Sequence, residues 1–138
     1  MSIHKDQDKE VKTIAGKFEK VEGPVKGHNV EPIYFDVELK KDKEFNFDIP
    51  ETHNSFIYLI NGEIKIGSKV HDKIKDSTLI LLDNGKDLKV KASSDSKFLL
   101  ISGKPLNEEI ARGGPFVMNT KKEILDAVND YHNGTFVK

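Results

Sequence analysis

Apolar and polar residues alternate along much of the first hundred residues, a pattern typical of β-strands that bury one face. Every second residue of the stretch IYFDVEL (33–39) is apolar, and EFNFDI (44–49) repeats the pattern. Pro50 ends the second stretch, because proline has no N–H to donate to a strand ladder. We therefore predict two strands here, each with one face toward a core.

The stretch SFIYLI (55–60) is apolar on both faces, which indicates a central strand covered on both sides. Asn61-Gly62 follows it, a pair typical of a type I′ turn with two positive φ angles. We expect residues 63–67 to pair back on this strand as a hairpin. Side chains two positions apart in a strand lie on the same face. Counted back from Gly62, the face predicted to point inward carries Asn54, Phe56 and Tyr58, which are therefore candidates to line a ligand pocket.

Further short apolar stretches at 78–82, 88–92 and 97–102 are separated by turn residues such as DNGK (83–86). About eight short strands at this spacing predict an all-β fold, an antiparallel barrel or sandwich. Residues 1–30 begin with a polar segment that we expect to be loose, with one possible short strand at 10–18. We interpret residues 1–30 as an N-terminal extension and linker-like segment, and residues 31–104 as the barrel.

The period of the pattern changes near the C-terminus, where residues 119–134 predict an amphipathic helix. Thr120 and Glu123 have the spacing of a capping box, and Gly134 stands where a helix commonly ends. We therefore expect residues 105–138 to form a loop and a capping helix.

Composition excludes several classes of function. The 138 residues carry 22 basic and 23 acidic side chains, finely mixed, so no field would attract nucleic acid or an anionic membrane. There are no cysteines, which excludes disulfides and thiolate chemistry. The first residues are charged and lack the apolar run of a signal peptide. We expect a cytoplasmic protein.

The stretch GGPFVMNTKKEILDAVNDYHNGTF (113–136) closely resembles the C-terminal signature of the pirin family. The residues that carry the resemblance most strongly are Gly114, Pro115, Phe116, Met118, Asn119, Thr120, Asp130 and Tyr131. Two further stretches are also similar to the second half of a pirin: SFIYLINGEIKIG (55–67) and ISGKPLNEEIARGGPF (101–116). The second differs from the usual family sequence at Ala111-Arg112.

The resemblance implies a cupin-type (jelly-roll) β-barrel with a C-terminal α-helix. Pirins are similar to bicupins, with two barrels in one chain and the metal, usually iron, in the first. Some pirins oxidise flavonols such as quercetin and others act as regulators. The resemblance covers only the second half, so we expect the first, metal-binding barrel to be absent.

The histidines do not have the spacing of a cupin metal site. Such a site needs a His-x-His pair, a carboxylate on the same face and a further histidine. His4, His28, His53, His71 and His132 contain no such pair. We therefore expect no metal, no cofactor and no catalytic residue. We interpret His53 as a loop or rim residue, with hydrogen bonding at a pocket mouth as the lesser alternative. We interpret His71 as an exposed turn residue. His132, in the last turn of the predicted helix, is well placed to interact favourably with the helix dipole.

Three functions remain open on this evidence. The first is a non-catalytic binding or structural module that forms a homodimer or docks on a separately encoded pirin N-terminal barrel, because an uncovered apolar face normally finds a partner. The second is a metal-dependent, quercetinase-like oxygenase, which would need a partner metal-binding barrel. The third is a small-ligand-binding cupin, with Asn54, Phe56, Tyr58 and His53 as the pocket candidates.

Overall fold

A computed structural model of the chain describes residues 2–67 and 73–137. The chain divides into two compact units, residues 1–105 and residues 106–138. His71, expected in an exposed turn, lies outside the described residues.

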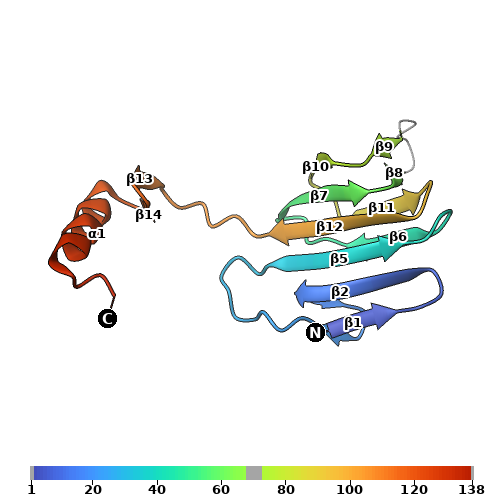
Figure 1. Ribbon diagram of the computed structural model, residues 1–138, viewed down its shortest axis with the longest axis horizontal. Helices are drawn as coiled ribbons and strands as arrows, with labels where there is room; N and C mark the ends of the chain where they lie inside the picture. The colour runs from blue at the N-terminus through green and yellow to red at the C-terminus, as the bar shows by residue number, and fades with distance from the viewer. Residues whose placement is uncertain (1, 68–72, 138) are drawn as a thin grey trace. The chain divides into compact units, whose positions relative to one another are not determined.

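The first unit consists of two antiparallel sheets that face each other across one core (Figure 1). The six-stranded sheet has the order β1 (Ser2–Lys5), β2 (Lys9–Ala15), β5 (Ile33–Leu39), β12 (Ser96–Gly103), β7 (Asn54–Asn61) and β10 (Thr78–Leu82). The four-stranded sheet has the order β6 (Glu44–Asp48), β11 (Asp87–Ala92), β8 (Glu63–Ile66) and β9 (Ile74–Lys75). The short pair β3 (Lys17–Phe18) and β4 (Val21–Glu22) completes this unit. The prediction of an all-β antiparallel fold is confirmed.

Aromatic rings contributed by both sheets fill the core. Phe35 and Phe98 of the six-stranded sheet and Phe45 of the four-stranded sheet are fully buried. The rings of Phe45 and Phe98 meet edge to face with centroids 5.6 Å apart. Such pairs stabilise a core beyond the area that they bury. The alternating residues predicted to face inward in 33–39 are indeed buried.

The expectation of a loose N-terminal segment is wrong for residues 2–10, whereas the possible short strand at 10–18 corresponds to β2, which ends at Ala15. Strand β1 pairs with β2, and β2 pairs with β5, so this segment adds two strands to the main sheet. Val11 and Thr13 of β2 are fully buried. The charged residues mislead because this end of the sheet has one face in solvent, where lysine and glutamate alternate with the buried positions.

The predicted hairpin at Asn61-Gly62 is also wrong. Strand β7 pairs with β10 and β12, whereas β8 pairs with β11 and β9, so Gly62 is the point where the chain passes between sheets. Gly62 has a φ of 94°, and Asn61 is not among the residues with positive φ. A Cβ atom on Gly62 would collide with Ser96, whose side chain accepts a hydrogen bond from the Glu63 amide. Close approach to Ser96 therefore requires glycine here.

The second unit contains the hairpin of β13 (Ala111–Gly113) and β14 (Phe116–Met118), followed by α1 (Lys121–Asn133). Thr120 and Glu123 form the predicted capping box, and Gly134 adopts the left-handed conformation with a φ of 70°. His132 lies in the last turn, where a positive charge would favour the helix dipole. The predicted C-terminal helix and its two ends are confirmed.

Candidate functional site

Strand β7 presents the opposite face to the interior from the one predicted. Ile57 and Leu59 are fully buried, whereas Asn54 is exposed and Tyr58 is 38% exposed. Phe56 shares the outward face of Tyr58 and is half-buried. The prediction that Asn54, Phe56 and Tyr58 line an interior pocket is therefore wrong. The prediction failed because both faces of this strand are apolar, so its composition does not show which face is buried.

His53 lies in the loop just before β7, but it is buried and not exposed at the rim. It contacts Ser102 and borders two cavities, in line with the lesser alternative of hydrogen bonding at a pocket mouth. The residue is 4% exposed and continues the inward parity of Ser55 and Ile57. Its backbone N–H donates to the carbonyl of Pro50 at 2.9 Å, which closes the turn before β7 and directs the ring inward. A buried imidazole requires hydrogen-bond partners, so its surroundings decide what it can do.

Two serines from neighbouring strands satisfy one side of the imidazole. Nδ1 of His53 lies 3.0 Å from Oγ of Ser102 on β12. The hydroxyl of Ser55 on β7 donates to the same Ser102 oxygen at 2.8 Å. The register pairs Ser102 with Ser55, which places all three side chains together. The sequence offered no signal for this cluster, because lone serines and one histidine carry no motif.

The other ring nitrogen of His53 has no hydrogen-bond partner. Nε2 is buried, and the nearest opposite charge is a carboxylate oxygen of Glu31 at 3.9 Å. Lys104 lies 3.9 Å from the second oxygen of that carboxylate. His53 and Glu31 line the same cleft of about 510 Å³ between the segments 16–33 and 50–53. His53 and Ser55 also border a cavity of about 170 Å³ at the mouth between the sheets.

These residues do not fit the metal set that the cupin resemblance would suggest. Within residues 2–67 and 73–137, no group of three or more His, Cys, Asp or Glu side chains lies close enough together to hold a metal ion. The inward positions of β7 next to His53 are Ser55 and Ile57, which are not ligands for first-row metals.

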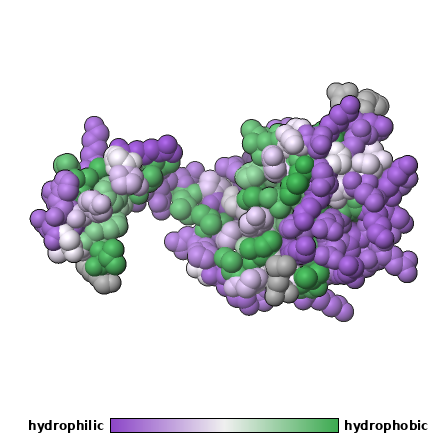
Figure 2. Space-filling view, in the orientation of Figure 1, coloured by the Kyte–Doolittle hydropathy of each residue, from purple (hydrophilic) through white to green (hydrophobic). Residues whose placement is uncertain are grey.

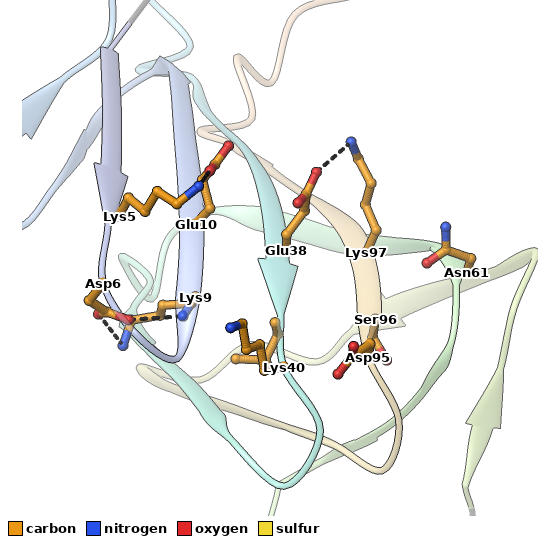
Figure 3. Close-up of a pocket in the computed structure, with 11 residues that line it drawn as sticks. Lys5, Asp6, Lys9, Glu10, Glu38, Lys40, Asn61, Asp95, Ser96 and Lys97 are labelled. Carbon is orange, nitrogen blue, oxygen red and sulfur yellow. Dashed lines mark hydrogen bonds and ion pairs between the residues drawn. The ribbon is translucent and has the colours of Figure 1, made fainter.

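A second cavity, of about 480 Å³, lies at the opposite ends of the strands and is lined mainly by charged side chains (Figure 3). Lys5 pairs with Glu10 at 2.7 Å, and Lys97 pairs with Glu38 at 3.2 Å. The Asp6 carboxylate accepts hydrogen bonds from the backbone amides of Asp8 and Lys9, which hold the pKa of Asp6 well below its usual range. Most of the charges that line this cavity therefore pair with one another, an arrangement typical of a solvated ion-pair network.

The outward side of the six-stranded sheet carries a contiguous apolar area, hereafter the outer face. It consists of the rows Leu81–Phe56–Ile101 and Leu79–Tyr58–Leu99, each running across β10, β7 and β12. Leu81 is 78% exposed and Leu79 is 57% exposed. Figure 2 shows hydrophobic side chains gathered over these three strands, with hydrophilic ones on the right-hand side of the same view. Exposed apolar areas of this kind commonly mark interaction sites.

The residues that carry the pirin resemblance have structural roles within residues 106–138. Gly114 and Pro115 form the turn between β13 and β14, with a φ of 56° at Gly114. The side-chain amide of Asn119 donates to the backbone carbonyl of Glu109 at 2.9 Å, and Asn119 directly precedes the helix cap Thr120. The Phe116 ring lies 6.4 Å from that of Tyr131, and the backbone carbonyl of Asp130 accepts from the amide of Thr135. Met118 is half-buried at the end of β14.

In the part of the chain that the structure describes, no helix is long and apolar enough to cross a bilayer.

Comparison with known proteins identifies one protein family that matches most of this chain. The profile of the family described as the pirin C-terminal cupin domain matches residues 34–137. A pirin-like protein of Solanum lycopersicum is 41% identical over 104 residues, covering 74% of this chain and 36% of that protein. A pirin-like protein of Caulobacter vibrioides is 31% identical over 127 residues, covering 91% of this chain and 45% of that protein.

Among solved structures, the chain is similar to a quercetin 2,3-dioxygenase from Acinetobacter baumannii. The TM-score is 0.82 at 30% identity, and the match covers 99% of this chain and 47% of that one. The chain thus spans about half the length, or less, of these relatives. The likeness extends through the first strands, β1 and β2, as well as through the C-terminal unit.

Proposed function

The chain belongs to the pirin family as its C-terminal cupin domain, and on that premise we propose that it is a non-catalytic module that binds a second, pirin N-terminal-type barrel. The observation that carries the proposal is the outer face. Its two rows present large aliphatic and aromatic side chains on three adjacent strands of a rigid sheet.

The outer face has the features of a docking surface. Leu79 and Leu81 stand on the edge strand β10, and both project their side chains into solvent. On β5, the Leu79 row ends at Asp36 and the Leu81 row ends at Tyr34. Lys97 pairs with Asp36 and with Glu38 on the same sheet. An apolar centre with a charged margin is the usual anatomy of a protein interface.

The length of the relatives supports a barrel as the occupant. The chain covers 47% of the similar Acinetobacter protein and 45% of the Caulobacter protein, so each relative has a further part of comparable size. The matched family is the C-terminal domain, which places that further part before it. We infer that the partner of the outer face is a barrel equivalent to that part.

The test is a binding experiment with the full chain. The part of the Acinetobacter protein outside the 47% that this chain covers is co-expressed with it as a separate polypeptide. Light scattering after size exclusion is expected to show a one-to-one complex. Leu81→Asp should abolish the complex while leaving the fold intact, because the side chain is already 78% exposed. Lys91→Asp, on the four-stranded sheet, is the matched control.

Two results would overturn this proposal. A chain that stays monomeric with and without the co-expressed part would show that the outer face does not bind a barrel. A homodimer that Leu81→Asp dissociates would assign the face to a second copy of this chain instead.

A role in catalysis is the second candidate, because the similar Acinetobacter structure is that of a quercetin 2,3-dioxygenase. In this reading the partner barrel supplies the metal, and this chain supplies no ligand to it. Elemental analysis and quercetin turnover of the purified complex test the idea. Metal bound stoichiometrically by this chain alone would contradict it.

A further inference from the structure

The His53 cleft, lined by His53, Glu31 and the segments 16–33 and 50–53, contains an unsatisfied buried polar atom. The side chain of His53 is 2% exposed, and its Nε2 atom has no hydrogen-bond partner. Buried polar atoms are paired in the great majority of cases, and leaving one unpaired costs about 1–3 kcal/mol. This cost suggests that something outside the chain pairs with Nε2.

The hydrogen bonds of the two serines indicate which role Nε2 has. Ser102 accepts from the hydroxyl of Ser55, so its own proton is available to donate to Nδ1 of His53. A neutral imidazole has one donor and one acceptor nitrogen. When Nδ1 accepts, Nε2 carries the proton and donates into the cleft.

A donor and an acceptor therefore stand side by side at one point of the cleft. Nε2 of His53 and the carboxylate oxygen of Glu31 are 3.9 Å apart, too far for a direct hydrogen bond. Nε2 is closed to solvent in this conformation, so an oxygen atom reaches it only when the exposed Glu31 side chain turns; at about 2.8 Å from each atom it then accepts from Nε2 and donates to the carboxylate. A hydroxyl group does both at once, whereas a carboxylate has no proton to donate and an ammonium has no acceptor.

The walls next to this pair are aliphatic. Val25, Pro32, Ile33 and Pro50 line the same cleft of about 510 Å³. Pockets for small organic ligands commonly combine apolar walls with a few polar groups that fix the orientation. We propose that the His53 cleft binds a small hydroxylated ring, whose hydroxyl bridges His53 and Glu31 and whose ring lies on the aliphatic wall. This site shares no residue with the outer face and does not depend on the docking function.

The test is a titration of the full-length chain, followed by NMR on the His53 ring, which is assigned through its contacts to Ser102. The probes are phenol and cyclohexanol, with benzene as the ring that lacks a hydroxyl. Either hydroxylated ring should shift the His53 ring signals saturably, and the comparison of the two distinguishes an aromatic from an aliphatic ligand. Benzene should bind at least about tenfold more weakly, because it leaves both polar groups unpaired.

The matched variants are Glu31→Ala and Glu22→Ala. Both carboxylates line the cleft, but Glu22 pairs with Lys26 at 3.1 Å, whereas Glu31 faces His53. The Glu31 side chain is 65% exposed, so its removal should leave the fold intact. Glu31→Ala should weaken binding of the hydroxylated rings about tenfold, and Glu22→Ala by less than about twofold.

Three results would overturn the proposal. The first is no saturable shift with either hydroxylated ring, which would mean that water alone occupies the site. The second is binding of benzene as tight as that of phenol and cyclohexanol. The third is an equal loss of affinity in the two glutamate variants.

Discussion

The imidazole Nδ1 atom of His53 lies 3.0 Å from the hydroxyl oxygen of Ser102, although the two residues are 49 positions apart in the chain. Strands β7 and β12 are neighbours in the six-stranded sheet, and their register pairs Ser102 with Ser55. The contact therefore joins the turn before β7 to the end of β12. It fixes the orientation of the imidazole that borders the proposed ligand site.

Ser102→Ala should destabilise the fold, because it leaves Nδ1 of His53 buried without a partner and removes the acceptor of Ser55. The expected loss is about 1–3 kcal/mol in the free energy of unfolding. Urea denaturation monitored by circular dichroism measures it. Ser94→Ala is the control, since Ser94 precedes the opposite end of β12, is only half-buried and forms its hydrogen bonds through its backbone. Equal stability of the two variants would contradict the prediction.

Gly62→Ala should be more damaging than an ordinary glycine substitution. The φ of 94° is costly for alanine, and its Cβ would meet Ser96 and the backbone of Asp95. Together these effects should cost about 2–4 kcal/mol. Gly85→Ala is the matched control, because a Cβ there meets nothing within 4 Å. Thermal unfolding of both variants decides, and a Gly62→Ala protein as stable as Gly85→Ala would show that the corner between the sheets can relax.

The stability of the turn between β1 and β2 should depend more on the hydrogen-bonding side-chain oxygen of Asp6 than on the negative charge of this residue. One carboxylate oxygen accepts from the amides of both Asp8 and Lys9, at 2.7 and 2.8 Å. Asp6→Ala loses both bonds and should destabilise the fold by about 1–2 kcal/mol. Asp6→Asn keeps an oxygen in the same place and should lose less than half as much. Hydrogen exchange of the β1 and β2 amides compares them, and identical effects would refute this account.

The N-terminus of α1 should weaken in acid through Glu123. Hydrogen bonds from the side chain and the backbone amide of Thr120 hold the pKa of Glu123 below its ordinary value of 4.5. Because the folded-state pKa is lowered, the stabilisation is complete above pH 4.5 and is lost as the pH falls through the lowered pKa. Amide exchange in the first turn of α1, followed by NMR between neutral pH and acid, should show the loss.

Glu123→Gln provides the control for this titration, because it keeps a hydrogen-bonding side chain that does not titrate. Its first turn should show no transition in the same pH range. Thr120→Ala removes the cap itself and should destabilise the helix by about 1 kcal/mol at neutral pH. A first turn whose acid response is unchanged in Glu123→Gln would assign the effect to another carboxylate.

Local patterns in the sequence predicted the elements whose signals are local. The alternation in 33–39 identified the inward residues of β5, because only one parity of that strand is apolar. The capping box and Gly134 identified both ends of α1, because their hydrogen bonds join residues within one helical turn. The same reasoning found a possible strand at 10–18, where β2 lies, but it failed for β1, which is recognisable only through its pairing with β2.

The sequence by itself determined the all-β class of the fold, its C-terminal helix and the family of the chain, since these depend on local periodicity and on a long signature. Only the tertiary structure decided which face of β7 is buried, because both of its faces are apolar and the pairing with β10 and β12 settles the choice. It also decided that Gly62 joins two sheets and that His53 meets Ser102 inside the protein. These features arise from hydrogen bonds between distant strands, which no short stretch of sequence encodes.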